Sequence, residues 1–483
     1  MVRQTKIVAT LGPATDREGA LAGVLRAGVD VVRLNLSHGN HAEHRQRSAA
    51  LRGAAQRHNR VVGLLCDLQG PKIRVGRFRD GIVELVEGQA FFLDPSLAKD
   101  AGTENGCGVG YAGLPQDVDP GDVLLLNDGL IRLRVDRVEG CRIFTVVEIG
   151  GTLSDHKGIN QLGGGLSVRA LTDKDHVDIQ LAAELEADYL AVSFPKGADD
   201  IEEARELLRA AGGHAAIVAK IERREAVDNL SEIMEAADAV MIARGDLAVE
   251  IGDAELPGVQ KRIMRLARER DCVVITATQM MQSMVNQPVP TRAEVLDVAN
   301  AVLDGTDAVM LSEESAVGRF PARAVAAMAR VCLGAERYAE ESRPPRLGPE
   351  PRYTRIDETI AKTAIAAANQ LSVRAIAAMT ESGATAMWMS RISTDIPIYA
   401  LSEQTRTLTK VTLYRGVHPI NFDPAGRGDH TAANRGAVEE LLGAGAIREG
   451  DLVLITQGDL AGVQGGTNTM KIVRVGDPIP DSA

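Results

Sequence analysis

The stretch 217-IVAKIERREAVDNLSEIMEAADAVMIARGD-246 contains two short apolar runs, Ile217–Ala219 and Ala239–Ile242, joined by a segment with a helical pattern. Lys220 and Glu222 follow the first run, and Asp246 follows the second. Side chains two residues apart on a strand point the same way and lie roughly 6–7 Å apart, so Lys220 and Glu222 face one space. If the two strands are neighbours in a parallel barrel, Asp246 reaches that space too. A cation beside two carboxylates indicates a site for a divalent metal and an anionic substrate. The alternative is a structural ion pair at a strand end.

Similar apolar runs alternate with helix-length segments along much of the chain. Continuous apolar strands, rather than alternating ones, indicate burial on both faces of a parallel sheet. Eight such strand–helix units predict a TIM (β/α)8 barrel, whose active site lies at the carboxyl ends of the strands. A doubly wound open sheet is the alternative from the pattern alone. We predict strands at Lys6–Thr10, Asp30–Asn35, Val61–Cys66, Tyr189–Ser193, Ile217–Ile221, Ala239–Ala243, Val273–Thr276 and Ala308–Leu311.

One interval, from about Arg74 to Gly163, reads differently. It has short alternating segments separated by Gly, Asp and Pro turns, which predicts a small all-β domain inserted after the third barrel strand. An insertion at that end of a barrel overhangs the active site and is suited to act as a lid. We expect the Gly-rich exit, Lys157–Asn160 and Gly163–Gly165, to be its hinge. The strands expected in it are Ile82–Val86, Val123–Leu126, Ile131–Val138 and Arg142–Val147.

The last part of the chain predicts a third, open-sheeted α/β domain. A helix is expected from Pro321 to Glu341, and Ser342–Tyr353, with four prolines, reads as a linker. We therefore divide the chain into a catalytic barrel (residues 1–72 and 164–342), an inserted β domain (73–163) and a C-terminal regulatory domain (343–483). The expected elements of the last are Glu358–Gln370, Arg374–Met379, Ile396–Ala400, Val417–Asn421, Leu452–Thr456 and Met470–Val475.

Composition narrows the class of protein. Apolar residues make up 45% and charged residues 25% of the chain, as in soluble globular proteins. A net charge of −12 argues against bulk affinity for nucleic acid or anionic membranes. The five cysteines are scattered and form no disulfide framework or metal knuckle. The N-terminus has no signal-peptide core, and no apolar run approaches the roughly 20 residues that span a bilayer. We expect a cytoplasmic protein.

Polar or charged residues follow nearly every predicted barrel strand, which would gather them on one rim. Four of them are cations that converge in an otherwise acidic protein: Arg33, Lys72, Arg74 and Lys220. Such a convergence favours a multiply charged anion, such as a phosphate ester, as the substrate.

These residues lie within a series of motifs that resembles the pyruvate kinase family along essentially the whole chain. Each motif alone is weak, but their joint order and spacing are very specific. The resemblance implies a barrel, a β lid inserted after its third strand and a C-terminal α/β domain, assembled as a homotetramer. The matching segments are Lys6–Pro13, Arg33–Gly39, Asp67–Gly76, Lys157–Asn160, Lys220–Glu222, Ala243–Glu250, Ala277–Met280, Thr291–Glu294, Asp297–Gly305 and Thr467–Met470.

The family reaction moves the phosphoryl group of phosphoenolpyruvate to ADP, giving ATP and pyruvate. By resemblance, Glu222 and Asp246 hold Mg²⁺ or Mn²⁺, for which carboxylates are suitable ligands. Lys220 would stabilise the phosphoryl group in flight, and Arg33 and Arg74 would grip it from the other side.

Two further groups of contacts carry over from the family. The backbone at Gly245 and Asp246, with Thr278, resembles a cradle for the substrate carboxylate. Thr278, together with Ser312 and Glu314, resembles the route that protonates the enolate, although a structural role is the alternative for the last two. The nucleotide contacts match Pro13, Asn35, His38, Arg74 and Lys157.

The monovalent-cation site departs from the common pattern. Many members of the family need K⁺, held by residues that match Asn35, Ser37, Asp67 and the carbonyl of Leu68. Those members have Thr-Lys-Gly-Pro-Glu where this chain reads Leu-Gln-Gly-Pro-Lys and ends at Lys72. We hypothesise that the Lys72 ammonium substitutes for K⁺, which makes the ion dispensable. The alternative is that Lys72 points to solvent and K⁺ is still required.

A loop in the third domain resembles the family's effector site, where hydroxyls and backbone N–H groups at a helix N-terminus bind a phosphate. Glu381 occupies a position that is often basic, which favours a monophosphate such as AMP or a sugar phosphate over a bisphosphate. An ordinary capped helix start is the alternative. Gln457–Gly466 would close over this site, and Arg292 matches a subunit-contact arginine. The candidate effector residues are Thr380, Ser382, Gly383, Ala384 and Thr385.

Two other functions remain open from the sequence. A barrel lyase or aldolase that handles pyruvate enolate would use the same metal carboxylates but would need neither Lys157 nor the arginine pair. A catalytically silent scaffold would be expected to have lost Lys220, Glu222, Asp246 or Thr278, and all four are present.

Overall fold

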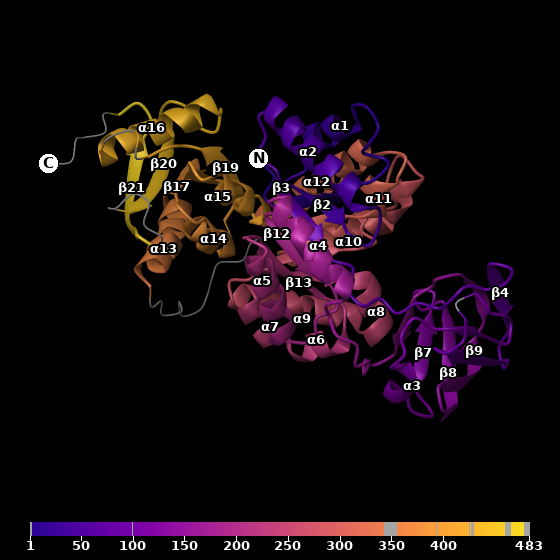
Figure 1. Ribbon diagram of the computed structural model, residues 1–483. Coiled ribbons are helices and arrows are strands. Elements are labelled where there is room, and N and C mark those ends of the chain that lie inside the picture. The colour runs from indigo at the N-terminus through magenta and orange to yellow at the C-terminus, as the bar shows by residue number, and fades with distance from the viewer. Residues whose placement is uncertain are drawn as a thin grey trace.

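The computed structural model describes residues 2–98, 100–341, 355–392, 394–424, 426, 429–458 and 465–477. Its centre is a closed barrel of eight parallel strands in the order β1-β16-β15-β14-β13-β12-β3-β2, so the predicted TIM barrel is confirmed (Figure 1). Each strand was predicted to within two residues of its observed bounds. The strands are β1 (Lys6–Thr10), β2 (Val31–Asn35), β3 (Gly63–Asp67), β12 (Tyr189–Val192), β13 (Ala216–Ile221), β14 (Ala239–Ala243), β15 (Val273–Ala277) and β16 (Ala308–Leu311).

Helices surround this barrel and bury its outer face with Ala, Val, Leu and Ile side chains. Two of them begin with capping boxes, Thr172 with Asp175 and Thr291 with Glu294, which satisfy the free N–H groups of the first turn. The helices are α1 (Ala20–Arg26), α2 (His41–Arg57), α4 (Asp173–Glu184), α5 (Ala198–Ala210), α6 (Arg224–Asp228), α7 (Leu230–Ala236), α8 (Arg244–Ile251), α9 (Leu256–Glu269), η1 (Gln282–Val285), α10 (Arg292–Leu303), α11 (Glu313–Ala316) and α12 (Pro321–Glu341).

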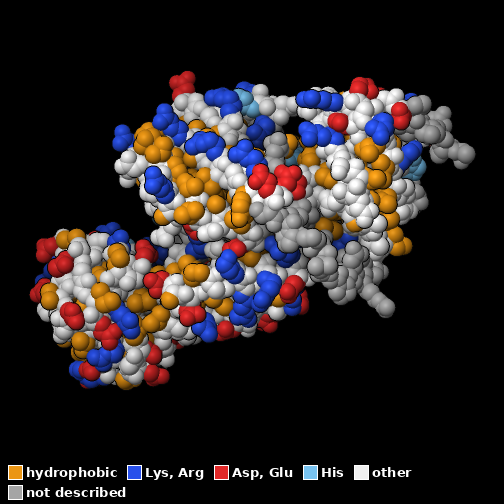
Figure 2. All heavy atoms as spheres, turned by 180° about the vertical axis from the view of Figure 1, so that it is seen from behind, with side chains coloured by type: hydrophobic (Ala, Val, Ile, Leu, Met, Phe, Trp, Pro, Cys, Tyr) orange, Lys and Arg blue, Asp and Glu red, His pale blue; other side chains and the backbone are white. Residues whose placement is uncertain are grey.

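The inserted β domain follows β3 and stands to one side of the barrel, beyond α8 (Figure 1). It has two sheets, ordered β10-β4 and β11-β7-β8-β9-β5-β6, and a hydrophobic core of its own. On the face seen in Figure 2, its acidic and basic side chains are interspersed. Its elements are β4 (Ile82–Leu85), β5 (Ala90–Asp94), β6 (Gly106–Gly108), α3 (Leu114–Asp117), β7 (Val123–Leu126), β8 (Ile131–Glu139), β9 (Arg142–Ile149), β10 (Gly151–Ser154) and β11 (Ile159–Gln161).

The expected hinge was partly wrong. Ile159–Gln161 forms strand β11, which pairs with β7, so this part of the Gly-rich exit belongs to the sheet of the inserted domain. Gly163, Gly164 and Gly165 instead make the exit turn, and all three have positive φ angles, a conformation that glycine adopts without strain.

The C-terminal domain is an open five-stranded sheet in the order β19-β18-β17-β20-β21, flanked by helices. Only β21 is antiparallel to its neighbour. The predicted linker Ser342–Tyr353 lies outside the described residues. The elements are α13 (Ile356–Leu371), β17 (Ala375–Met379), α14 (Ala384–Arg391), β18 (Ile398–Ser402), α15 (Thr405–Lys410), η2 (Val411–Leu413), β19 (Val417–Asn421), α16 (His430–Gly443), β20 (Leu452–Gly458) and β21 (Thr467–Arg474).

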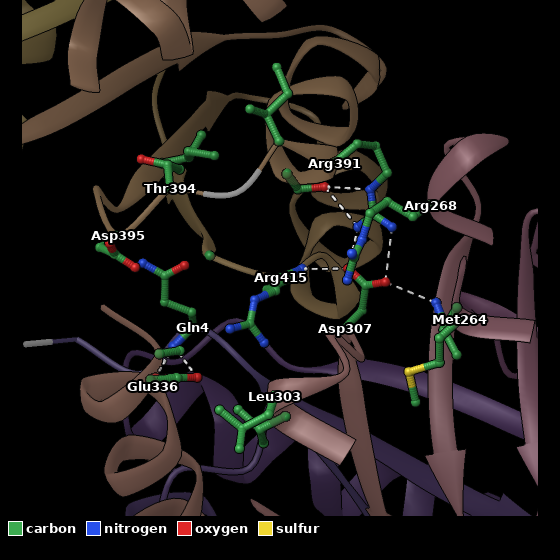
Figure 3. Close-up of a pocket in the computed structure, with 18 of the residues that line it drawn as sticks. Gln4, Met264, Arg268, Leu303, Asp307, Glu336, Arg391, Thr394, Asp395 and Arg415 are labelled. Atoms are coloured by element: carbon green, nitrogen blue, oxygen red, sulfur yellow. Dashed lines mark hydrogen bonds and ion pairs between the residues drawn. The ribbon is translucent and has the colours of Figure 1, made fainter. Parts of the chain in front are cut away.

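The C-terminal domain docks at the end of the barrel where the strands begin. Figure 3 shows Arg391 and Arg415 converging on Asp307, which directly precedes β16. Arg391 Nη1 lies 2.9 Å from one carboxylate oxygen of Asp307, and the Arg415 backbone N–H donates to the other at 3.2 Å. A cavity of about 550 Å³ lies beside these contacts. The docking site is therefore remote from the strand ends at which the sequence places the chemistry.

Within the described parts of the chain, no helix has both the length and the apolar character needed to cross a membrane.

Candidate active site

Lys220 lies at the centre of the residues gathered where the barrel strands end. Its Nζ atom is 2.9 Å from Glu222 Oε1 and 3.2 Å from Asp67 Oδ1. Lys220 on β13 and Glu222, which follows that strand directly, therefore face one space, as their spacing predicts. Nζ also donates to Ser193 Oγ at 2.6 Å. Arg33 joins this group from β2, with its Nε 2.6 Å from Asp67 Oδ2. We call Arg33, Asp67, Ser193, Lys220 and Glu222 the strand-end cluster.

The buried cations and carboxylates of the strand-end cluster shift one another's pKa values. Burial alone would lower the pKa of Lys220, but the negative charges of Asp67 and Glu222 outweigh it and raise that pKa. Burial would raise the pKa of Asp67, yet Lys220 and Arg33 hold it below its usual value. For Glu222, burial dominates and raises the pKa to about 6, with Lys220 opposing and Asp246 adding to the rise.

Asp246 lies in the first turn of α8, which follows β14 without an intervening loop. Its Oδ1 atom lies 3.1 Å from Nζ of Lys72, and the Lys72 side chain is 28% exposed. The ammonium therefore points into the site rather than to open solvent.

Hydrogen bonds from its backbone to a buried side chain hold the loop that carries Lys72. Asp175, fully buried in α4, accepts hydrogen bonds from the backbone N–H groups of Gln69 and Gly70 at 3.0 and 3.1 Å. Gly70 has φ +65°, and a β-carbon there would lie 2.7 Å from Cβ of Ser193. Only glycine fits both demands, so this position sets the path of the chain toward Lys72.

Two carboxylates, Glu222 and Asp246, are the residues that could hold a divalent metal. No group of three or more His, Cys, Asp or Glu suited to a metal occurs among the described residues. A pair of carboxylates still fits Mg²⁺ or Mn²⁺, because such ions are commonly bound by one or two carboxylates with the remaining oxygens from substrate and water. The influence of Asp246 on the pKa of Glu222 is consistent with their proximity.

Thr278 follows β15 in a strained turn. Its φ is +65° and that of Gln279 is +53°, values that are uncommon for residues other than glycine and that cluster at functional sites. Thr278 Oγ1 accepts a hydrogen bond from the backbone N–H of Gly245 at 2.8 Å. The Arg244 guanidinium holds the turn by donating to the carbonyls of Ala277 and Thr278 at 3.1 and 2.7 Å. The structure therefore brings Thr278 and Gly245 together.

The remaining candidate site residues make fewer contacts with the strand-end cluster. Burial and the positive charges of Arg74 and Arg33 lower the pKa of His38. Arg74 Nη1 donates to the carbonyl of His156 in the inserted domain at 3.1 Å. Among the described residues, neither Pro13 nor the Lys157 side chain makes a polar contact with the strand-end cluster.

The proposed monovalent-cation ligands lie close to the cluster. Asn35 Oδ1 accepts a hydrogen bond from the backbone N–H of Ser37 at 3.2 Å. The Leu68 carbonyl accepts one from Ser193 Oγ at 2.8 Å. Asp67 is shared with Arg33 and Lys220, so its negative charge is already compensated from two sides.

Glu314 is fully buried and accepts hydrogen bonds from the backbone N–H groups of Met281 and Ser312 at 3.1 and 2.7 Å. These contacts tie the turns after β15 and β16 together, which agrees with a structural role.

The effector-like loop leads into α14. Gly383, with φ +82°, precedes the helix, and its N–H donates to Thr380 Oγ1 at 3.0 Å. Thr385 Oγ1 lies 2.8 Å from Thr467 Oγ1 on β21. Part of the loop expected to close over it, residues 459–464, lies outside the described residues.

Three supporting residues were missed in the sequence: Ser193, Arg244 and Asp175. Ser193 directly follows β12 but carries no charge, so a search for charged residues at strand ends passes over it. Arg244 and Asp175 act on backbone groups far away in sequence, and no local pattern reveals such contacts.

A (β/α)8 barrel that gathers Lys220, Arg33 and a pair of carboxylates suited to a divalent cation where its strands end is the arrangement of a barrel-type phosphotransferase. The family models agree: that of the pyruvate kinase barrel domain matches residues 2–325, and that of the pyruvate kinase alpha/beta domain matches residues 358–473. The chain belongs to the pyruvate kinase family, and it is a kinase of glycolysis.

Relatives match over nearly the full chain. Pyruvate kinase II of Salmonella typhimurium is 53% identical over 479 residues, which cover 98% of this chain and 99% of that protein. The pyruvate kinase of Haemophilus influenzae is 50% identical over 472 residues, with 97% of each chain covered. That of Geobacillus stearothermophilus is 40% identical and covers 99% of this chain and 81% of its own.

Proposed function

We propose that the enzyme transfers the phosphoryl group of phosphoenolpyruvate to ADP at the strand-end cluster. The observation that carries this assignment is the position of Lys220, whose ammonium lies within 3.2 Å of two carboxylates, Asp67 at the end of β3 and Glu222 after β13. A substrate phosphate that enters this space meets a cation held in place and fully charged. Phosphoryl transfer depends mainly on such positioning and charge neutralisation.

Glu222 and Asp246 would hold a divalent cation, Mg²⁺ or Mn²⁺. When bound, this ion neutralises charge on the substrate carboxylate and phosphoryl oxygens. Lys220 and Arg33 would then face the phosphoryl oxygens from the barrel, and Arg74 from the entrance to the inserted β domain. Arg33 is already oriented by Asp67, so it needs little reorganisation to bind an anion.

Gly245, Asp246 and Thr278 would bind the substrate carboxylate. The Gly245 N–H already points to Thr278 Oγ1, so an entering carboxylate oxygen can replace that hydroxyl as its acceptor. The Thr278 hydroxyl, which donates to the Ala277 carbonyl at 2.7 Å, would then turn toward the enolate that must be protonated. ADP would lie toward Pro13, Asn35, His38, Arg74 and Lys157, with the inserted β domain acting as a lid.

We further propose that the enzyme works without K⁺. The Lys72 ammonium lies against Asp246, inside the site, where it supplies a fixed positive charge that a bound K⁺ supplies in many members of the family.

Regulation is proposed at the C-terminal domain. Thr380, Ser382, Gly383, Ala384 and Thr385 would bind a monophosphate, AMP or a sugar phosphate, in a cytoplasmic homotetramer. Titration with each compound at subsaturating phosphoenolpyruvate tests this, and sedimentation gives the oligomeric state. Activation that survives Thr385→Val and Ser382→Ala would place the effector elsewhere.

The decisive assay measures pyruvate formed from phosphoenolpyruvate with ADP and Mg²⁺. We expect Lys220→Met to abolish product formation while circular dichroism and thermal unfolding stay close to those of the wild type. Lys261→Met is the matched control, because Lys261 lies on the outer helix α9 with its side chain 64% exposed. Product that forms without ADP would identify a lyase-type reaction instead, and an inactive wild-type enzyme would reject the proposal.

A further inference from the structure

Ser193 directly follows β12, between the ends of β3 and β13, and it is 1% exposed. Its hydroxyl donates to the carbonyl oxygen of Leu68 at 2.8 Å and accepts from Lys220 Nζ at 2.6 Å. The Leu68 carbonyl is much nearer than the other acceptor, Asp67 Oδ1 at 3.5 Å, so it takes the single hydroxyl proton and leaves an oxygen lone pair for Lys220. The direction of this contact is therefore fixed by the backbone of the neighbouring strand.

Lys220 has three N–H donors and meets three acceptors: Ser193, Glu222 and Asp67. The two carboxylates have other partners. Asp67 accepts from Arg33 at 2.6 Å, and Glu222 is a proposed metal ligand. Both contacts must change strength when metal and phosphate enter, since each carries charge. Ser193 is the neutral member of the three and has no such competing role.

The turn that contains Ser193 also holds Glu222. The backbone N–H of Phe194 donates to Glu222 Oε2 at 2.8 Å, and Phe194 has φ +55°, an uncommon conformation for an aromatic residue. Gly70 packs against the same turn so closely that a β-carbon added to it would lie 2.7 Å from Ser193 Cβ. Local strain held by packing on both sides is typical of functional turns.

We propose that Ser193 is a positioning residue for phosphoryl transfer: its hydroxyl, oriented by the Leu68 carbonyl, holds the Lys220 ammonium in place when Glu222 turns to the metal. This inference rests on the proposed role of Lys220. It predicts an effect on the chemical step rather than on substrate binding, because Ser193 is buried and its hydroxyl is occupied by the Leu68 carbonyl and the Lys220 ammonium.

The test compares Ser193→Ala with Ser193→Thr in steady-state assays with phosphoenolpyruvate, ADP and Mg²⁺. Loss of one hydrogen bond to a charged group corresponds to about a 10- to 100-fold change in rate. We expect kcat of Ser193→Ala to fall by this factor, while KM for both substrates stays within about threefold. Ser193→Thr keeps the hydroxyl and should recover most of kcat.

Thr306→Val is the control for loss of a buried hydroxyl, because Thr306 is 0% exposed and lies at the opposite end of the barrel. Its kcat should match the wild type. If Ser193→Ala fails to fold, Ser193→Cys replaces it, since a thiol is a weak acceptor of similar shape. An unchanged kcat in the alanine variant, or equal losses in the alanine and threonine variants, would overturn the inference. An inactive wild-type enzyme would instead overturn the proposed function.

Discussion

The ammonium of Lys72 lies 3.1 Å from the carboxylate of Asp246, a residue 174 positions further along the chain. Lys72 stands at the entrance to the inserted β domain, and Asp246 lies in the first turn of α8, the helix after β14. A fixed cation is thereby placed against a proposed metal ligand. Any change in the path of the entry loop alters the charge around the reacting centre.

Monovalent-cation dependence tests this relationship. We expect wild-type activity to be retained when tetramethylammonium is the sole monovalent cation, because the Lys72 ammonium supplies the charge. Lys72→Glu should reduce activity in that medium by about tenfold or more and restore a response to K⁺. Activity of the wild type that is nearly lost without K⁺ would contradict the assignment.

Metal affinity gives a second test. Replacing Glu222 by Gln removes one of two anionic ligands, so the Mn²⁺ concentration for half-saturation should rise by about tenfold or more. Direct Mn²⁺ binding, followed by electron paramagnetic resonance, checks this independently of turnover. Glu206→Gln, on the exposed face of α5, is the matched control. Equal affinities in both variants would remove Glu222 from the metal site.

Stability should depend on the protonation of Glu250. Burial raises its pKa to about 7, although the hydrogen bond from Asn160 and the charge of Arg223 oppose the rise. The folded protein then binds this proton more tightly than the unfolded chain does, so the contribution of Glu250 to stability falls as pH rises from about 4.5 to about 7 and stays constant above pH 7.

Glu250→Gln should flatten that pH dependence. The difference in unfolding free energy across the interval is expected to be on the order of 3 kcal/mol, measured by urea unfolding at several pH values. Since Asn160 lies in β11 and donates to Glu250 at 3.3 Å, hydrogen exchange of β11 reports the same change locally. Parallel pH curves for the two proteins would show that Glu250 ionises normally.

Docking of the C-terminal domain should depend on Arg391. Both members of its ion pair with Asp307 are nearly inaccessible, with side chains 7% and 3% exposed. Arg391→Ala leaves a buried carboxylate without its cation and should cost about 3–5 kcal/mol of stability. Arg374→Ala, at an exposed position before β17, should change it by less than about 0.5 kcal/mol. Similar unfolding curves for both variants would contradict this.

Much of the fold could be predicted because the barrel strands are buried on both faces and therefore carry an unbroken apolar signal. β1, β14 and β16 have the predicted bounds. The facing of Lys220 and Glu222 follows from strand geometry alone. The segment that forms β11 was predicted to be part of a hinge because glycines flank it. Its pairing with β7 depends on the tertiary structure and leaves no signal in the local sequence.

The supporting contacts of the site could not be predicted in the same way. Ser193 matters because three neighbouring strands place its hydroxyl between Leu68 and Lys220, and the residue type alone does not reveal this. The same holds for Asp175, whose partners are backbone N–H groups more than 100 residues earlier in the chain. Sequence patterns indicate which groups meet the substrate, whereas the groups that hold them depend on packing.

The closure of the barrel also has a consequence for synthesis on the ribosome. β1 pairs with β2 on one side and with β16 on the other. One edge of β1 therefore stays unpaired until residues 308–311 have been synthesised. At ordinary translation rates this delay is roughly 15 to 60 s. The sheets of the inserted β domain, complete by Gln161, can form well before then. Until β16 is made, the nascent chain has an unpaired strand edge, and this is the state most exposed to aggregation. We therefore expect the need for chaperones to depend on the time between synthesis of β1 and of β16 more than on the stability of the finished enzyme.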